Sequence, residues 1–373
     1  ATFYRIADGA LSPLIGPMDT KEFYQVLDEE VIIRNGKKYA WSIPIAFPIK
    51  KTDGEKLKIG QTVAVVTKKG ELLGTLEIKD FFYFDKEKYN KVVYGTERTD
   101  HPGARIVNND PRDYLLGGII TALPQKKNKK LAKYLLSPQE SRDLFKKKGW
   151  ERIVAFQTRN PLHRAHEYAM VAAVEILTSQ GIFTGIVLNP LIGETKSDDV
   201  SAELRMQCYE NLKKKKLLGK GDIDPEIWKR IGYDINKVFE LIALDIKMFY
   251  GGPKEAVMHA IYRQNYGFTD LIIGRKHADA PFDDGDNIWG DFDAQEKFKK
   301  LKGELRINNL NVGFAAYYQE LGRVALMNSD LAKGLKPFAI SGKELRKQLH
   351  AGKLPDERMI RPETAKILIK AYK

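Results

Sequence analysis

Apolar and polar positions follow two different rhythms along this chain. Up to about residue 147, short runs of β-forming residues, such as 63–66 and 73–78, are separated by turns of glycine and lysine. A helix-like stretch, 138–148, follows them. After Trp150 an apolar run precedes a helical pattern that stops at Gly181. The change of rhythm predicts a mainly β N-terminal domain followed by alternating strands and helices.

The alternation after Trp150 defines four predicted strands, at residues 153–156, 182–188, 239–244 and 271–273. Between them lie three predicted helices, at about 162–180, 201–215 and 253–267. This order predicts a doubly wound parallel sheet that binds ligands at the carboxyl ends of its strands. A small mixed module follows. We therefore expect an α/β multidomain chain with three domains, at residues 1–147, 148–310 and 311–373.

Length and composition are those of a globular protein with several cores. The chain has 373 residues, more than one core of about 250–300 residues holds. Hydrophobic residues make up 43% and charged residues 30%, and no run approaches the roughly 18 apolar residues of a membrane helix. Residues 1–16 lack a basic segment and a long apolar segment, so we expect a cytoplasmic protein without a membrane partner.

Charge and cysteine content narrow the chemistry only partly. Cys208 is the single cysteine, which excludes an internal disulfide and a zinc site built on several thiolates; we expect it in the core. The net charge is +13, with lysine runs at 126–130, 146–148 and 213–216. Such runs are usually solvated faces, but they also attract nucleic acid, ATP or sulfate. The acidic stretch 283–293 lacks EF-hand spacing, so we expect a solvated or pairing loop there.

The most informative segment is Gln157-Thr-Arg-Asn-Pro-Leu-His-Arg-Ala-His-Glu167, at the junction of the first predicted strand and helix. A helix N-terminus presents unpaired N–H groups and the positive end of a dipole. His163 and His166, three residues apart, project from the same face of the first turn, beside Arg159 and Asn160. Two imidazoles in that place can hold one anion. The segment therefore predicts a phosphate-binding site.

The same segment resembles the QxRNPxHxAH signature of ATP sulfurylases, a variant of the HxGH motif of many nucleotidylyltransferases. A second string, 271–278, resembles the strand and GRDHAG sequence of that family. Softer resemblances lie at Asp100-His-Pro-Gly with Asp113-Tyr-Leu-Leu-Gly-Gly, at Leu191-Ile-Gly-Glu-Thr-Lys, and at Ile340-Ser-Gly with Arg346. The family implies an N-terminal PUA-like barrel, a central Rossmann-like catalytic domain and a small C-terminal α/β domain.

The resemblance implies sulfate adenylyltransferase activity, in which ATP and sulfate reversibly give adenylylsulfate (APS) and pyrophosphate. Sulfate would attack the α-phosphorus in line, so the protein must align two anions and neutralise charge; donors matter more than bases. ATP would enter as its Mg²⁺ complex, with few protein ligands to the metal. The family also implies a homodimer or higher homo-oligomer without a nucleic-acid partner. Residues 317–337 contain no cysteine or histidine, so we expect no zinc.

Residue roles follow from the resemblance alone. The catalytic set would comprise Thr158, Arg159, Asn160, His163 and His166. The sulfate would be held by Gln157, Arg159 and the main chain at Ala278. Thr158 and Asn160 would orient the α-phosphate, and the two histidines would bind the β- and γ-phosphates. Nucleotide contacts are expected from Gln157, Asn160, His163, His166, Gly274, Arg275 and His277. The main chain of residues 314–316, which ends at Ala316, would contact the adenine.

Several positions depart from the family pattern. Lys276 stands for aspartate and Asp279 for glycine beside the expected site, and Lys343 stands for threonine in the ISGTxxR string. We hypothesise that Lys276 turns away from the nucleotide and pairs with a carboxylate of residues 283–286. We expect His101, His259 and His350 to be structural or exposed. We also expect a short N-terminal segment and no fused kinase domain.

Two other functions remain open at this point. A related nucleotidylyltransferase would use a carboxylate, a phosphate ester or nicotinamide mononucleotide as acceptor, although Gln157 and Arg159 favour a bare oxyanion. A nucleic-acid-binding protein would use the basic surface, but residues 125–130 contain no aromatic side chain for base stacking. Sulfate assimilation and ATP synthesis from APS would use the same residues.

Overall fold

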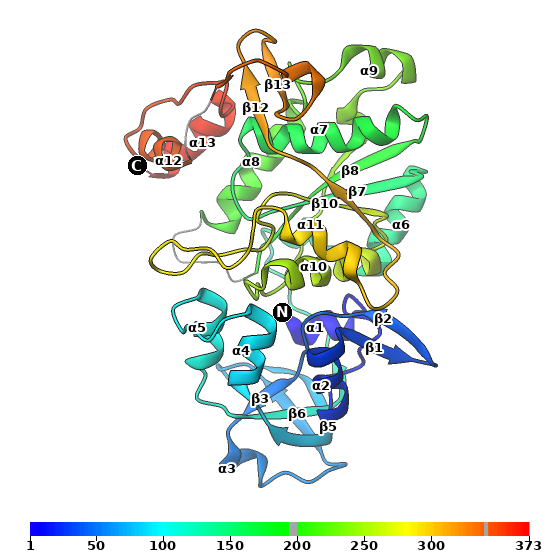
Figure 1. Ribbon diagram of the computed structural model, residues 1–373. Coiled ribbons are helices and arrows are strands. Elements are labelled where there is room, and N and C mark those ends of the chain that lie inside the picture. The colour runs from blue at the N-terminus through cyan, green and yellow to red at the C-terminus, as the bar shows by residue number, and fades with distance from the viewer. Residues whose placement is uncertain (194–199, 339–341, 373) are drawn as a thin grey trace.

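The centre of the molecule is a five-stranded parallel sheet (Figure 1). The computed structural model describes residues 1–193, 200–338 and 342–372. In spatial order the strands are β11 (Asn308–Asn311), β10 (Asp270–Ile273), β7 (Arg152–Thr158), β8 (Thr184–Pro190) and β9 (Phe239–Leu241). The parallel sheet predicted for the central domain is therefore confirmed. All four strands expected from the sequence are present.

Helices cover both faces of this sheet because its apolar residues alternate between two cores. Ile153 and Ala155 of β7 belong to one core, with helices α6 (Pro138–Lys148), α10 (Gly252–Tyr266) and α11 (Asp293–Lys297). Val154 and Phe156 belong to the other, with α7 (Arg164–Thr178), α8 (Ala202–Lys214) and α9 (Pro225–Ile231). Near-continuous apolar strands are expected where both faces are buried.

The strand order places a topological switch point between β7 and β10. From β7 the chain moves to β8 and β9 on one side, and then crosses to β10 and β11 on the other. Ligands of open parallel sheets bind at such a point, beyond the carboxyl ends of the strands. The fifth strand, β11, was missed by the sequence analysis because its residues, Asn-Asn-Leu-Asn, form no apolar run; it straddles the domain boundary expected at 310.

The N-terminal region contains a four-stranded antiparallel sheet, but also helices that the sequence analysis did not identify. The sheet comprises β3 (Phe47–Ile49), β6 (Tyr114–Ala122), β5 (Leu72–Tyr83) and β4 (Thr62–Val66), beside the hairpin β1 (Val31–Arg34) and β2 (Lys37–Ala40). The helices are α1 (Thr2–Ala7), α2 (Thr20–Glu29), α3 (Lys51–Gly54), α4 (Lys86–Tyr94) and α5 (Pro102–Asn108).

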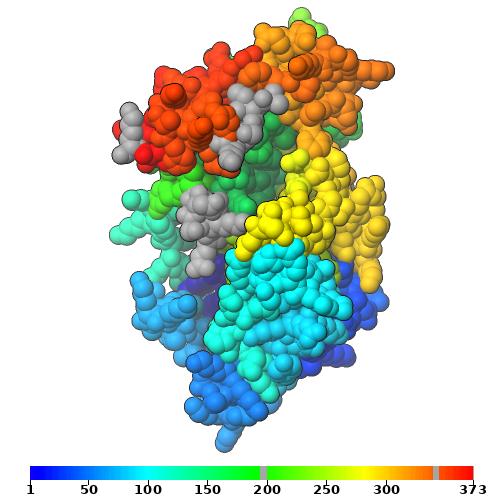
Figure 2. Space-filling view, turned by 60° about the vertical axis from the view of Figure 1, so that its left-hand side comes forward, coloured from blue at the N-terminus to red at the C-terminus, as the bar shows by residue number. Residues whose placement is uncertain are grey.

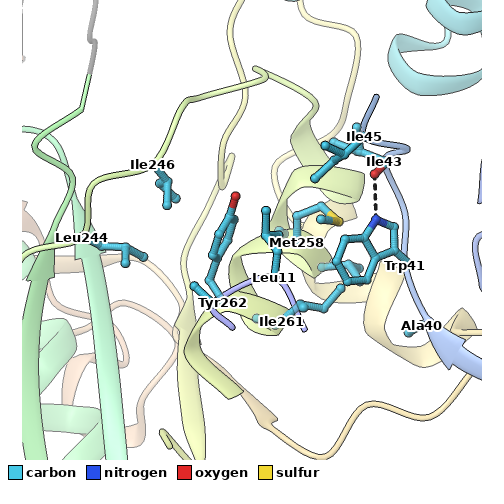
Figure 3. Close-up of a cluster of buried hydrophobic side chains, with 14 of the residues drawn as sticks. Leu11, Ala40, Trp41, Ile43, Ile45, Leu244, Ile246, Met258, Ile261 and Tyr262 are labelled. Carbon is cyan, nitrogen blue, oxygen red and sulfur yellow. Dashed lines mark hydrogen bonds between the residues drawn. The ribbon is translucent and has the colours of Figure 1, made fainter. Parts of the chain in front are cut away.

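One continuous core joins the N-terminal region to helix α10 (Figure 3). Leu11 and Trp41 pack in the same cluster as Met258 and Ile261, and all four are almost fully buried. The Trp41 indole N–H donates to the carbonyl of Ile43 at 2.9 Å, so its polar atom is satisfied inside the core. Helix α10 is thus fixed between the sheet and the N-terminal region.

The acidic stretch 283–293 forms ion pairs with arginines in α5 and just before it, as expected of a pairing loop. Asp284 pairs with Arg98 at 2.7 Å, and Asp283 pairs with Arg105 at 2.5 Å. The Arg98 guanidinium also lies 3.7 Å from the centre of the Phe282 ring. Figure 2 shows the residues of this loop, in yellow, against those of α4 and α5, in cyan. Because the pairs are exposed, each contributes about 1 kcal/mol or less to stability.

The C-terminal part adds a three-stranded antiparallel sheet and two helices above α7 and α8 (Figure 1). These elements are β13 (Arg323–Leu326), β12 (Ala315–Tyr318), β14 (Pro337–Phe338), α12 (Gly342–His350) and α13 (Pro362–Tyr372). Short 3-10 helices lie at Ala132–Tyr134, Ile235–Lys237, Phe298–Lys300 and Asp330–Ala332. Cys208 packs with Leu368 of α13, which confirms it as a core residue, and burial raises the pKa of its thiol to about 12. Within the described ranges, no helix has both the length and the apolar character needed to cross a membrane.

Candidate active site

The loop between β7 and α7 is held in shape by its own polar groups. The Thr158 hydroxyl accepts the N–H of Asn160 at 3.1 Å and lies 3.0 Å from the Asn160 carbonyl, to which it donates. The Tyr209 hydroxyl donates to the same carbonyl at 2.7 Å. Thr158 is buried and Asn160 is exposed. The hydroxyl of Thr158 therefore shapes this turn, whatever else it contacts.

The two histidines of the motif stack on each other at the start of α7, which begins at Arg164 and not at the expected residue 162. Their ring centres are 3.7 Å apart and the rings are inclined by 21°. Nδ1 of His163 accepts the main-chain N–H of His166 at 3.4 Å, so His163 is the N-cap. A neutral His163 therefore carries its proton on Nε2, which is free to donate elsewhere.

Burial keeps this histidine pair neutral. It lowers the pKa of His163 to about 4, and it lowers the pKa of His166 well below 6.5, with His163 as a second cause. At neutral pH both rings therefore act as N–H donors, and the positive field comes from the helix N-terminus and from Arg159. Binding of an anion would raise both pKa values.

Three polar atoms around this loop are buried without a hydrogen-bond partner among the described residues: Gln157 Oε1, Arg159 Nη1 and His166 Nδ1. The Arg159 guanidinium lies over the ring of Tyr250, with its central carbon 5.6 Å from the ring centre. An unpaired buried polar group costs about 1–3 kcal/mol, so native proteins rarely leave several together. Their concentration at the carboxyl end of β7 indicates a site for a polar ligand.

The end of the neighbouring strand β10 lies beside this candidate site. Arg275 is exposed, and its guanidinium lies 4.8 Å from the centre of the Phe314 ring. A side chain at Gly274 would meet nothing within 4 Å, so the space above β10 is open. The carbonyl of Ala278 accepts the N–H of Gly252, which ties this loop to α10. Ala316 lies two residues beyond Phe314, in β12.

His277 leans on a second histidine that the sequence analysis set aside as structural. Nδ1 of His259 lies 3.1 Å from Nε2 of His277, and Glu255 lies one turn before His259 on α10. The side chains of Glu255, His259 and His277 are surrounded by other protein groups. Burial lowers the pKa of His277 to about 3. The spacing of Glu255 and His259, four residues apart, was the available sequence signal.

The hypothesis about Lys276 needs a correction. Its side chain does bond to the acidic loop, but to the amide oxygen of Asn287, at 2.6 Å, and not to a carboxylate of residues 283–286. Two of those carboxylates, Asp283 and Asp284, pair with arginines from the N-terminal region. The main-chain N–H of Lys276 also bonds to the carbonyl of Asp291, and its φ is +48°. Burial raises the pKa of the neighbouring Asp279.

Two expected elements lie outside the described residues: Glu194, Thr195 and Lys196 of one loop, and Ile340 and Ser341 of the ISG string. Arg205, fully buried, bonds to the carbonyls of Leu191 and Val200 on either side of the first of these. Within the described ranges, no group of three or more histidine, cysteine, aspartate or glutamate side chains is arranged to hold a metal ion.

A buried charge network underlies the first turn of α7. Glu167 pairs with Arg361 at 2.6 Å, and Arg164 pairs with Asp222 at 2.5 Å. Arg361 also donates to the carbonyl of Lys220. The N–H of Arg164 bonds to the carbonyl of Met359 at 2.8 Å. The C-terminal segment therefore sets the position of the helix that carries the histidine pair.

We expect Arg361→Ala to destabilise the protein by about 3 kcal/mol or more at pH 8, because it leaves Glu167 buried and unpaired. Burial already raises the pKa of Glu167 to about 7 from 4.5, so this carboxyl favours folding most below pH 4.5, and that contribution is lost as the pH rises through 7. Removing the cation raises the pKa further. The difference in free energy of unfolding between the two proteins should therefore be larger at pH 8 than at pH 6, as measured by urea denaturation.

Arg358→Ala is the matched control for this prediction, because Arg358 lies in the same segment but pairs with Asp356 at a partly exposed position. It should cost about 1 kcal/mol or less. Equal losses in the two variants would contradict a special role for the buried network.

Comparison with known proteins agrees along the whole chain. A family model described as ATP-sulfurylase matches residues 132–371, and one described as PUA-like domain matches residues 2–125. A sulfate adenylyltransferase of Pyropia yezoensis is 50% identical over 374 residues, covering 100% of this chain and 89% of that protein. A sulfate adenylyltransferase of a Synechococcus strain is 37% identical over 369 residues, covering 99% and 86%.

Among solved structures, a hexameric APS kinase from Thiobacillus denitrificans matches with a TM-score of 0.69 at 18% identity. The match covers 98% of this chain and 60% of that one. At this identity the likeness concerns the fold alone.

Proposed function

The chain belongs to the ATP-sulfurylase family, and on that premise we propose that it is a sulfate adenylyltransferase, which converts ATP and sulfate reversibly to adenylylsulfate and pyrophosphate. The observation that carries the proposal is the pair of buried nitrogens of Arg159 and His166, unpaired among the described residues, which follow β7 at the switch point between β7 and β10. The exposed guanidinium of Arg275, 3.8 Å from Asp291, follows β10. These groups suit two anions that must meet.

The chemistry requires that an oxygen of sulfate attack the α-phosphorus of ATP. A new bond forms between that oxygen and phosphorus, and the bond from the α-phosphorus to the bridging oxygen of pyrophosphate breaks. No proton has to be removed from sulfate, so the protein acts by alignment and by stabilising negative charge. This is consistent with a site whose donors outnumber its bases.

We assign the sulfate to Arg159 and Gln157, with help from the main chain at Ala278. The planar guanidinium offers two parallel N–H groups to one oxyanion, and its cation–π contact with Tyr250 favours the observed placement. The Asn160 side chain is assigned to the α-phosphate, with Thr158 holding the turn beneath it. Because Thr158 already bonds to Asn160, its contribution is to fix the loop.

The pyrophosphate half of ATP is assigned to His163 and His166. His163 presents Nε2–H because its Nδ1 is used as the helix cap. The donors then lie at the helix N-terminus, where the dipole favours the charge that develops on the departing group. Gly274, Arg275 and His277 are assigned to the rest of the nucleotide. The main chain from Phe314 to Ala316 is assigned to the adenine.

The substrate is expected to be the Mg²⁺ complex of ATP, with the metal held by phosphate oxygens and water. We further propose a cytoplasmic homo-oligomer, a dimer or larger, to be checked by sedimentation. The physiological direction, assimilation of sulfate or ATP synthesis from APS, depends on pyrophosphate removal and uses the same residues.

The direct test is ATP formation from adenylylsulfate and pyrophosphate with Mg²⁺, measured with purified protein. ATP should appear only when all three are present. In the opposite direction, exchange of labelled pyrophosphate into ATP should require sulfate, because no adenylyl-enzyme intermediate is expected. Exchange without sulfate, or with a phosphate ester in its place, would instead support a related nucleotidylyltransferase with another acceptor.

A further inference from the structure

Glu255 is a buried carboxylate that makes contacts toward both halves of the site. It lies in the first turn of α10 and is fully buried. One oxygen accepts the main-chain N–H of Phe249 at 2.8 Å, and the other accepts that of Gly251 at 3.0 Å. Between them stands Tyr250, with φ at +60°, a left-handed conformation that is costly for a side chain of this size. The carboxylate therefore holds this turn closed.

The turn matters because of what Tyr250 contacts. Its ring lies under the Arg159 guanidinium, 5.6 Å from centre to carbon, on the sulfate side of the proposed site. A guanidinium held over an aromatic ring by a cation–π contact still has N–H groups that can bond to a ligand. Glu255 is thus connected to Arg159, the residue assigned to sulfate, through the main-chain turn at Tyr250.

The same carboxylate faces the nucleotide side through His259. Its Oε1 lies 3.4 Å from Nε2 of His259, a close contact of opposite polarity whose angles do not make a hydrogen bond. Nδ1 of His259 lies 3.1 Å from Nε2 of His277. An anionic Glu255 favours the proton of a neutral His259 on Nε2, which leaves Nδ1 to accept. His277 must then donate from Nε2, and its Nδ1 carries no proton.

We propose that Glu255 is a positioning residue of the reaction, which sets Arg159 through the Tyr250 turn and sets the orientation and tautomer of His277 through His259. The proposal rests on the sulfate adenylyltransferase function proposed above. It predicts that one buried group, which touches neither substrate, holds both substrate-binding halves in register.

Other charged and titratable groups surround this chain of contacts. Burial raises the pKa of Glu255 to about 7, while the main-chain N–H groups oppose the shift. Arg263, also buried, donates to the carbonyl of His259 and to Asn189, and its positive charge disfavours protonation of both histidines. Tyr89, Tyr94 and Tyr262 also interact electrostatically with Glu255. Glu255 is the carboxylate in close contact with His259.

The test uses the whole protein with histidines labelled with ¹⁵N, and compares wild type with Glu255→Gln and His259→Gln. Glu255→Gln keeps the volume but can accept only one of the two main-chain N–H bonds. In wild type at pH 8, the imidazole spectrum should show His277 protonated on Nε2. In Glu255→Gln this tautomer should no longer be the main one, while the resonance of His350, which stacks on Tyr372 in the C-terminal part, should stay unchanged.

The kinetic arm separates positioning from folding. Both variants should lose about tenfold or more in kcat/KM for ATP formation. Glu255→Gln should also raise the KM for sulfate in the opposite direction, because it releases the Tyr250 turn, whereas His259→Gln should not. In a His277→Ala background, His259→Gln should add less than a twofold loss, since its effect passes through His277.

Additive losses in the double variant, or an unchanged His277 tautomer in Glu255→Gln, would overturn the proposal. His259→Gln guards against a Glu255 variant that does not fold, because it leaves the turn intact. If wild type makes no ATP, the proposed function fails. The tautomer of His277 in the two proteins then still decides whether Glu255 sets it.

Discussion

Replacing His166 with alanine is expected to lower kcat about 10²-fold or more, because the ring donates to charge that develops on the departing pyrophosphate. Loss of one preorganised donor costs roughly 3–4 kcal/mol in the barrier. Thermal stability should change little, since Nδ1 of His166 has no partner to lose within the described residues. The measurement is kcat for ATP formation beside a thermal unfolding curve.

His163 needs a different substitution because it also caps α7. His163→Ala removes both the cap and the donor, whereas His163→Asn keeps a good capping oxygen and removes the imidazole. We expect both variants to lose turnover about 10²-fold, and only the alanine variant to lose about 1 kcal/mol of stability. Turnover restored by asparagine would show that His163 serves the helix and not the substrate.

Arg159→Lys is expected to raise the KM for sulfate by about tenfold or more, or to abolish activity, because a point charge does not replace a two-pronged donor. The substitution also alters the cation–π contact with Tyr250. Affinity for MgATP, measured by calorimetry without sulfate, should be largely intact. Equal losses of sulfate and ATP affinity would contradict a sulfate-specific role.

Arg152→Lys offers the matched control at the opposite end of β7. Arg152 makes two hydrogen bonds to Asp270, so it shares the forked geometry but lies far from the carboxyl ends of the strands. We expect this change to lower stability modestly and to leave the KM for sulfate unchanged. An effect on sulfate of similar size in both variants would mean that Arg159 acts through stability.

The sequence predicted the parts of the site that follow from local pattern. The run of apolar residues at 153–156, the glycine at 181 and the two histidines three apart were enough to place a helix N-terminus at the end of a buried strand. The end of the neighbouring strand β10 could also be predicted, because an apolar run followed by Gly274 indicates where a strand ends.

The sequence analysis missed elements whose apolar residues have no clear helical or strand periodicity. β11 has one apolar residue in four and is a strand only because β10 offers it a partner. Helix α2, in contrast, did carry a signal: the Asp19 side chain caps it, and Phe23, Val26 and Leu27 have helical spacing. The expectation of a mainly β domain obscured that pattern.

Relations between distant segments could not be obtained from local patterns. His259 looks like any residue on the buried face of a helix until the loop after β10 brings His277 against it. Lys276 was expected beside the nearest carboxylates, but arginines from α5 and the residues before it occupy two of these. Pairing across more than 170 residues depends on how the domains pack, which no period in one strand or helix encodes.

The bond from Arg164 to Met359, together with the pairing of Glu167 with Arg361, also bears on how the protein forms. These contacts join positions about 195 residues apart, so they close a long loop of the chain. Contacts of such separation are made late, after local helices and hairpins. During synthesis, the parallel sheet can therefore assemble while the helix that bears His163 and His166 still lacks its anchor. Ligand-binding competence should appear as a separate, final step of maturation.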